Sequence, residues 1–141
     1  MMVALVRPDS WNLPLFLHVL GATVLVGAIG ATVLIAVRAP AWRRLLVRTI
    51  GFLVLPAWVL MRFAGQWLDS REDIPGDPSW LGVGFLVGDA GLLLLVITAL
   101  IAWRGLRHPE RRWPVRAVAA ISGLYLIAVF IAMWAMTTKP D

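Results

Sequence analysis

The sequence predicts an all-α fold in which four antiparallel transmembrane helices form one bundle and one domain over residues 1–141. Hydrophobic residues make up 60% of the chain and charged residues only 15%, which is far from the balance of a soluble domain. The apolar residues fall into four runs, each about as long as the roughly 20 residues that a bilayer crossing needs. Short connections that contain charged residues and prolines separate these runs, so consecutive helices are expected to be antiparallel neighbours.

The four predicted spans cover about residues 13–37, 49–68, 80–103 and 114–136. The first run is longer than the roughly 7–15 apolar residues of a signal peptide, so we interpret it as a retained span. Proline is tolerated in the first turn of a helix, and Pro14 and Pro114 fit that position in the first and fourth spans. Pro56 lies inside the second span and predicts a kink there.

Charge is distributed unevenly among the connections. The first and third are basic, and they contain Arg38, Arg43, Arg44, Arg48, Arg104, Arg107, Arg111, Arg112 and Arg116 with Glu110 as the only opposing charge. The second is acidic, with Asp69, Glu72, Asp73 and Asp77 opposed by Arg71. By the positive-inside rule, the basic connections are expected in the cytoplasm, and both chain termini on the opposite side of the membrane.

The formal net charge of +5 does not indicate nucleic acid as a partner. The arginines flank apolar spans, where basic residues contact anionic lipid headgroups, so membrane lipid is the expected partner. Tryptophans agree with this interpretation, because they fall at the expected membrane interfaces. They are Trp11, Trp67, Trp80 and Trp134 at the outer side and Trp42, Trp103 and Trp113 at the inner side, and only Trp58 lies deep.

Small residues in the third span predict close helix packing. Gly84 and Gly88 form a GxxxG motif that Gly91 continues on the same side. Such motifs let helix backbones approach one another in lipid. The glycines fit either packing within one bundle or a seam with a second copy, so a homo-oligomer or other membrane subunits are possible partners.

Three titratable residues fall well inside the predicted spans. His18, Arg62 and Asp89 lie roughly 8, 9 and 13 Å from the outer ends of their spans, so all three are expected in the outer half of the membrane. An isolated charge there costs at least about 2.5–3.5 kcal/mol. We therefore expect Arg62 and Asp89 to form a buried ion pair between adjacent helices. Gln66 lies one turn after Arg62 and extends the same polar face.

Each of these residues also has a purely structural interpretation. The Arg62–Asp89 pair would then fix helix register only, and His18 would be a neutral imidazole that hydrogen-bonds a neighbour. Tyr125 either donates to a cofactor or bonds to a carbonyl oxygen. Met136, with Met133 and Met61, offers thioethers that suit Cu(I) together with imidazole, although methionine is also a common filler of apolar helices.

With these residues identified, the chain resembles a group of bacterial four-helix membrane proteins. Residues 16–28, FLHVLGATVLVGA, are similar to the LHxxGAxxxxG opening of a family of unknown function, and residues 133–140, MWAMTTKP, resemble its M-x-x-K-P close. More distant similarity runs to copper-resistance D-type membrane domains and to HemJ-type protoporphyrinogen oxidases. The resemblance implies the cytoplasmic membrane of a bacterium and a haem or porphyrin contact at His18. The oxidases need a lysine deeper in the bundle, whereas this chain has only Lys139, beyond the last span.

Three functions stay open at this point. The first is binding of haem b or a porphyrin through His18, with Arg62 near a propionate and Met136, water or His18 of a second copy as the other ligand. The second is transport or metal handling, with a metal at His18 and a polar path along Arg62 and Asp89; copper is the less expected cofactor. The third is an accessory subunit without a cofactor. No nucleophile–base pair, phosphate loop or zinc motif favours an enzyme.

Overall fold

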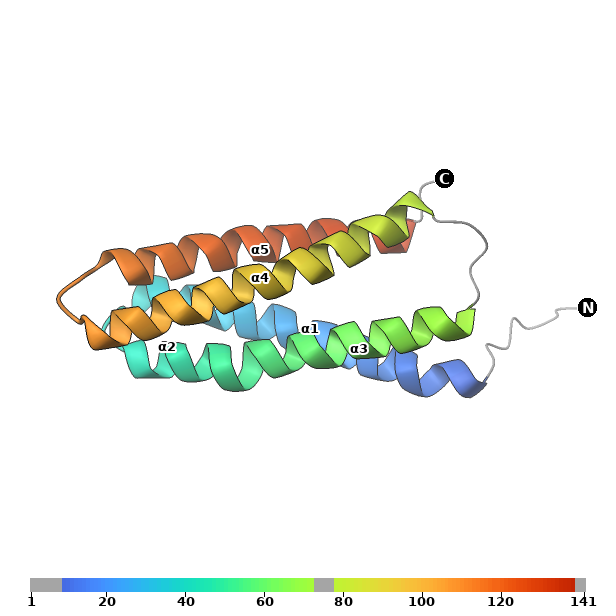
Figure 1. Ribbon diagram of the computed structural model, residues 1–141, viewed down its shortest axis with the longest axis horizontal. Helices are drawn as coiled ribbons and strands as arrows, with labels where there is room; N and C mark the ends of the chain where they lie inside the picture. The colour runs from blue at the N-terminus through green and yellow to red at the C-terminus, as the bar shows by residue number, and fades with distance from the viewer. Residues whose placement is uncertain (1–8, 73–77, 139–141) are drawn as a thin grey trace, which may run out of the picture.

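The structure is a computed structural model that describes residues 9–72 and 78–138. Long helices run side by side, and α1 begins at the same end of the bundle where α5 ends (Figure 1). The second long helix consists of α2, the π-helical segment η1 and α3, which follow one another without a break. The elements are α1 (Asp9–Arg38), α2 (Arg43–Thr49), η1 (Ile50–Val54), α3 (Leu55–Glu72), α4 (Ser79–Arg107) and α5 (Trp113–Thr138).

Four helices are long and apolar enough to cross a membrane: α1, the continuous helix from α2 to α3, α4 and α5. Each predicted span lies inside one of them, so the chain has the character of a polytopic membrane protein. The helices extend beyond the predicted spans, most clearly for the second span, whose helix begins at Arg43. Hydropathy detects only the apolar part of a helix, whereas backbone hydrogen bonding continues into the polar flanks. The 29 residues of α4 rise about 43 Å, more than the roughly 30 Å of a hydrocarbon core.

The helices do not contact one another equally. α1 packs extensively against α3 and α5, and α4 packs against α5, whereas α3 and α4 make few contacts. In Figure 1, α3 and α4 separate towards the end where α4 begins. One core cluster surrounds Leu25, Trp58 and Tyr125, and a second surrounds Ile50 and Val118 nearer the arginine-rich end. The weak α3–α4 contact leaves one side of the bundle open.

The prolines take two different places in the helices. Pro114 is the second residue of α5, as expected. Pro14 lies inside α1, because that helix begins at Asp9 and not at the first apolar residue, so its placement in the first turn is wrong. Pro56 follows η1, Ile50–Val54. Proline removes a backbone N–H and its ring clashes one turn back, and a local π-helical segment is one way in which a membrane helix accommodates it.

The glycines of α4 make room for large side chains of the same bundle. A Cβ atom on Gly84 would collide with the Met136 side chain, and one on Gly91 would collide with the Tyr125 hydroxyl. Gly88 is buried between them along the same ridge. Of the two interpretations of the GxxxG motif, these contacts favour packing within one bundle, whereas a second copy stays a prediction.

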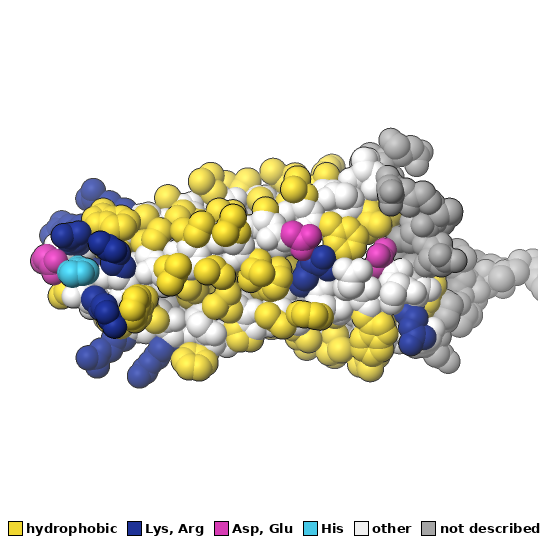
Figure 2. Space-filling view, viewed as in Figure 1, with side chains coloured by type: hydrophobic (Ala, Val, Ile, Leu, Met, Phe, Trp, Pro, Cys, Tyr) yellow, Lys and Arg dark blue, Asp and Glu magenta, His cyan; other side chains and the backbone are white. Residues whose placement is uncertain are grey.

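The end of the bundle opposite to the chain termini is basic, and Figure 2 shows Lys and Arg side chains gathered there. One of these arginines has a structural role that the sequence did not indicate. Arg43 donates from Nη1 to the Gly105 carbonyl at 2.7 Å, and from Nη2 to the Pro109 and Arg111 carbonyls at 2.8 and 3.0 Å. It thereby ties the start of α2 to the end of α4 and the turn that follows.

Candidate functional site

A cleft of about 130 Å³ lies where α3 and α4 separate, and all four long helices contribute to its walls. His18 comes from α1, Arg62 and Asp69 from α3, Phe85 from α4 and Met136 from α5. The sequence placed His18 and Arg62 at a similar depth, and the structure brings them to the same cleft. We therefore treat this cleft as the candidate site.

His18 is held against α3 by a backbone contact. Its Nδ1 lies 2.8 Å from the Met61 carbonyl oxygen. A carbonyl only accepts, so Nδ1 carries the hydrogen, and in the neutral ring Nε2 keeps its lone pair. Two glycines permit this approach: a Cβ on Gly21 would lie 2.6 Å from the Met61 nitrogen, and one on Gly65 would lie 2.9 Å from His18 Nδ1. The LHxxG sequence thus places an imidazole and a close helix contact on one face of α1.

Arg62 connects α3 to α4. Its Nε donates to Asp89 Oδ1 at 2.8 Å, and its Nη1 donates to Gln66 Oε1 at 2.8 Å. The guanidinium carbon also stands 4.9 Å from the centre of the Phe85 ring, within the range of a cation–π contact. The contacts with Asp89 and Phe85 thus bridge two helices that make few other contacts.

The expected burial of this ion pair is wrong. The side chain of Arg62 is 22% exposed and that of Asp89 is 62% exposed. None of the buried polar side chains in the described part of the chain is charged. Asp89 follows the buried Gly88 directly, and one residue corresponds to about 100° of rotation, so its side chain leaves the face that packs inward. Figure 2 shows acidic and basic side chains together part-way along this face.

Tyr125 belongs to the core and does not line the cleft. Its side chain is 2% exposed and lies across Gly91. Its hydroxyl lies beside the Trp58 indole, but the indole N–H is donated to the Gly88 carbonyl at 2.9 Å. Among the residues that the structure describes, the hydroxyl has no hydrogen-bond partner. The expected bond to a carbonyl is therefore wrong, and nothing connects Tyr125 to a ligand in the cleft.

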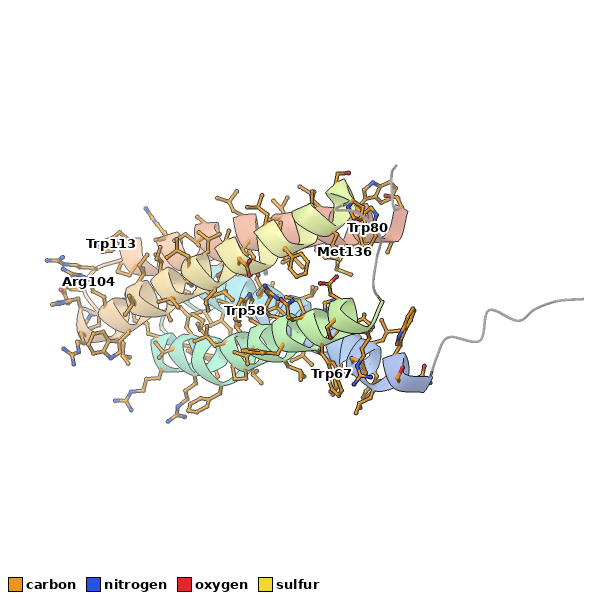
Figure 3. All side chains as sticks on the ribbon, turned by 45° about the vertical axis from the view of Figure 1, so that its right-hand side comes forward. Trp58, Trp67, Trp80, Arg104, Trp113 and Met136 are labelled. Carbon is orange, nitrogen blue, oxygen red and sulfur yellow. The ribbon has the colours of Figure 1, made fainter. Side chains whose placement is uncertain are left out.

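The methionines separate into two groups. Met136 and Met61 both line the cleft. Figure 3 shows the Met136 side chain extending from α5 into the space between the helices, at the same end as Trp80. Met133 is 44% exposed and is not part of the cleft walls. The cleft thus combines one imidazole, from His18, with two thioethers.

Four further cleft residues were not identified as a site from the sequence. Asp69, Trp80, Phe85 and Gly65 all line the cleft. Asp69 continues the polar face of Arg62, and it forms no ion pair with any residue in the ranges 9–72 and 78–138. Phe85 lies one helical turn before Asp89, the residue that pairs with Arg62. This spacing is the sequence signal that could have identified Phe85 as part of the site. Lys139 and the acidic residues Asp73 and Asp77 lie outside the described residues.

Within the described ranges, no group of three or more His, Asp or Glu residues is placed to hold a metal ion. Comparison of the chain with protein-family models, curated proteins and solved structures gives no match. The resemblance to the four-helix family of unknown function therefore stays a prediction. The function has to be argued from the residues of the cleft.

Proposed function

We propose that this polytopic membrane protein binds a small, soft metal cation of the chemical class of Cu(I) in the cleft, and so handles that ion at the membrane. The observation that carries the proposal is the convergence of the His18 imidazole with the thioethers of Met61 and Met136 in one cleft. Imidazole and thioether are ligand types that Cu(I) prefers over hard cations. The three side chains come from three different helices, α1, α3 and α5, and they line the same cleft.

The orientation of His18 supports a ligand role. A histidine that binds a metal commonly donates its other ring N–H to a backbone carbonyl or a carboxylate, which fixes the tautomer and the ring. The bond from His18 Nδ1 to the Met61 carbonyl has this form. It leaves Nε2, the nitrogen with the lone pair, as the ligand atom.

The charges of the cleft also favour a cation. Arg62 is paired with Asp89, so its positive charge is matched within the chain. Asp69 adds a carboxylate without an ion-pair partner in the described ranges. An anionic ligand would meet an unbalanced carboxylate and an arginine that is already engaged.

The same geometry supports binding of haem b or a porphyrin less well than binding of a metal ion. The cleft volume of about 130 Å³ is below the roughly 300–1,000 Å³ of pockets that hold organic ligands of ordinary size. Arg62, the expected partner of a propionate, donates to Asp89 and Gln66 instead. A haem shared between two copies and an accessory subunit without a cofactor are the alternatives that an experiment has to separate.

The test is a titration of the detergent-purified protein with Cu(I) against a competing chelator, and with Ag(I) as a redox-stable probe. One ion per chain is expected, and His18→Ala and Met136→Leu should each lower the affinity at least about tenfold. Met133→Leu is the matched control, because it makes the same change on the same helix outside the cleft. Equal affinity of the Met136 and Met133 variants would overturn the proposal. A Soret band in the absorption spectrum that shifts on chemical reduction would favour haem instead.

We further propose that the cleft opens to the outside of the cytoplasmic membrane of a bacterium. The arginine-rich connections lie at the opposite end of the bundle (Figure 2), and basic connections stay in the cytoplasm. Alkaline phosphatase fused after Thr138 should be active, whereas the same enzyme fused between α1 and α2 should be inactive. The reverse pattern would place the cleft on the cytoplasmic side.

A further inference from the structure

A second, larger cavity lies at the arginine-rich end, where α1 ends and α5 begins. Its volume is about 880 Å³, which falls within the range of roughly 300–1,000 Å³ for sites that hold organic molecules. Its walls combine aliphatic side chains with Arg112 and Arg116. This cavity shares no wall residue with the cleft and is independent of the proposed metal site.

Among the residues that the structure describes, Glu110 is the only acidic one in the walls, and it is already engaged. Glu110 Oε1 lies 3.5 Å from His108 Nδ1 and 3.7 Å from Arg111 Nε. Arg43, which also lines the cavity, directs its donors to backbone carbonyls. Neither side chain is therefore available to balance the two remaining guanidinium groups.

Arg112 and Arg116 are neighbours one helical turn apart at the start of α5. Neither forms an ion pair with any residue in the described part of the chain. Positive charge at a helix N-terminus is also unfavourable, because the backbone N–H groups there carry partial positive charge. Both features indicate an anion that comes from outside the chain, and paired guanidinium groups suit the oxygens of a phosphate.

The apolar walls of the cavity indicate that the anion is attached to an apolar group. Val37 from α1 and Val115 and Ala119 from α5 line the same cavity. The 26 residues of α5 rise about 39 Å, so its first turn reaches the headgroup region of a bilayer with a core of about 30 Å. A ligand for this cavity therefore combines a phosphate at headgroup depth with an apolar chain.

We infer that this cavity binds an anionic phospholipid, with the phosphate between Arg112 and Arg116 and an acyl chain along Val37 and Ala119. Basic pockets between transmembrane helices on the cytoplasmic side bind such headgroups in other membrane proteins. The site is more specific than the general attraction of arginines to an anionic membrane, because it depends on two named guanidinium groups and an adjacent apolar wall.

The experiment measures lipid binding to the full chain in dodecyl maltoside, by native mass spectrometry and by the thermal unfolding midpoint. Added phosphatidylglycerol should bind to and stabilise the protein more than phosphatidylcholine does. In the double variant Arg112→Gln/Arg116→Gln, the affinity for phosphatidylglycerol should fall by about tenfold or more. The control Arg44→Gln/Arg48→Gln makes the same change of charge at the same end, outside the cavity walls, and should keep the wild-type affinity.

Ala119→Leu is a second variant, which keeps both guanidinium groups and fills the apolar wall. It should also weaken phosphatidylglycerol binding, and so keeps the proposal testable if the double variant does not fold. Inorganic phosphate is the probe for a free-anion site, and equal stabilisation by it would overturn the lipid assignment. Equal loss of affinity in the Arg44/Arg48 control, or unchanged binding in both cavity variants, would overturn the site itself.

Discussion

The two ends of the bundle are each held by an arginine, and the two arginines do so in different ways. Arg43 donates to backbone carbonyls at the end of α4 and in the following turn, so the backbone sets the positions of its acceptors. Arg62 donates to side chains instead: to Asp89 of α4, across the gap where α3 and α4 separate, and to Gln66 on its own helix. Backbone acceptors close one end of the bundle, whereas side-chain acceptors span a gap at the other end and leave room for a cleft.

The largest effect in this comparison is expected from Arg43→Ala. This change removes hydrogen bonds to four carbonyls, and the bonds to Gly105 and His108 are partly buried. Bonds from charged donors contribute about 1.5–3 kcal/mol each, and partial exposure reduces their sum, so we expect a loss of about 3 kcal/mol in the free energy of unfolding. Reversible unfolding in mixed micelles measures it. The exposed neighbour Arg44, changed to alanine as a control, should stay within about 0.5 kcal/mol of wild type.

Gly91→Ala tests the packing between the two ends. The added methyl group would collide with the Tyr125 hydroxyl, and overpacking of a core costs about 1–3 kcal/mol. Tyr125→Phe should restore only a small part of the lost stability, because it removes the hydroxyl oxygen, whereas the ring carbons Cζ and Cε2 would still collide with the added methyl group. Gly123→Ala has open space around the new methyl group and serves as the control. A Gly91→Ala variant as stable as Gly123→Ala would contradict this account of the glycine ridge.

Gly65→Ala acts on the cleft with little effect on the rest of the bundle. The new Cβ would lie 2.9 Å from His18 Nδ1, so the imidazole has to move away from α3 and from the Met61 carbonyl. Loss of such a positioning contact commonly lowers metal affinity about 10–100-fold, and we expect an Ag(I) affinity at the lower end of that range. The chelator competition assay measures this affinity. Gly27→Ala is the control, because the added methyl group meets open space there. Unchanged affinity would mean that His18 is not a ligand.

The smallest effect is expected when both charges of the outer pair are removed together. In Arg62→Gln/Asp89→Asn, amides replace two groups that are partly exposed, and interhelical polar contacts in membranes contribute only about 0.6 kcal/mol on average. The free energy of unfolding should therefore change by less than about 1 kcal/mol. Arg62→Gln alone should be the more destabilising change, because it leaves Asp89 without its partner. If the double variant were as unstable as Arg43→Ala, the two arginines would contribute equally to stability, and this comparison of the two ends would be wrong.

The sequence predicted the features that depend on local pattern. Apolar runs located all four long helices, and helical rise placed His18, Arg62 and Asp89 near a common level. The exposure of Asp89 was not predictable in this way, because it depends on how far α3 and α4 separate. Arg43 was interpreted as a topology signal, since nothing in its sequence context shows that the carbonyls at the end of α4 lie within its reach.

The cleft was predictable only in part for a similar reason. His18, Met61 and Met136 were candidate ligands, but Met133 was grouped with them and does not line the cleft. A helical wheel assigns residues to faces of one helix and does not say which faces of four helices meet. Tyr125 shows the converse: its polar atom suggested a site, whereas Gly91 on the adjacent helix makes a place for it in the core.

The π-helical segment η1 also has a consequence for how this chain tolerates insertions and deletions. A π-helical turn closes an i→i+5 hydrogen bond, and so holds one residue more than an α-helical turn. Because one residue corresponds to about 100° of rotation, η1 sets the angle between the face of α2 that carries Arg43 and the face of α3 that carries Met61 and Arg62. Deletion of a single residue between Ile50 and Val54 would let the helix become regular and keep the two faces in register, because an α-helical turn makes the same rotation with one residue fewer. The same deletion in the regular part of α3 before Met61 would instead turn the two faces apart by about 100°, and it would change the cleft without altering any residue that lines it.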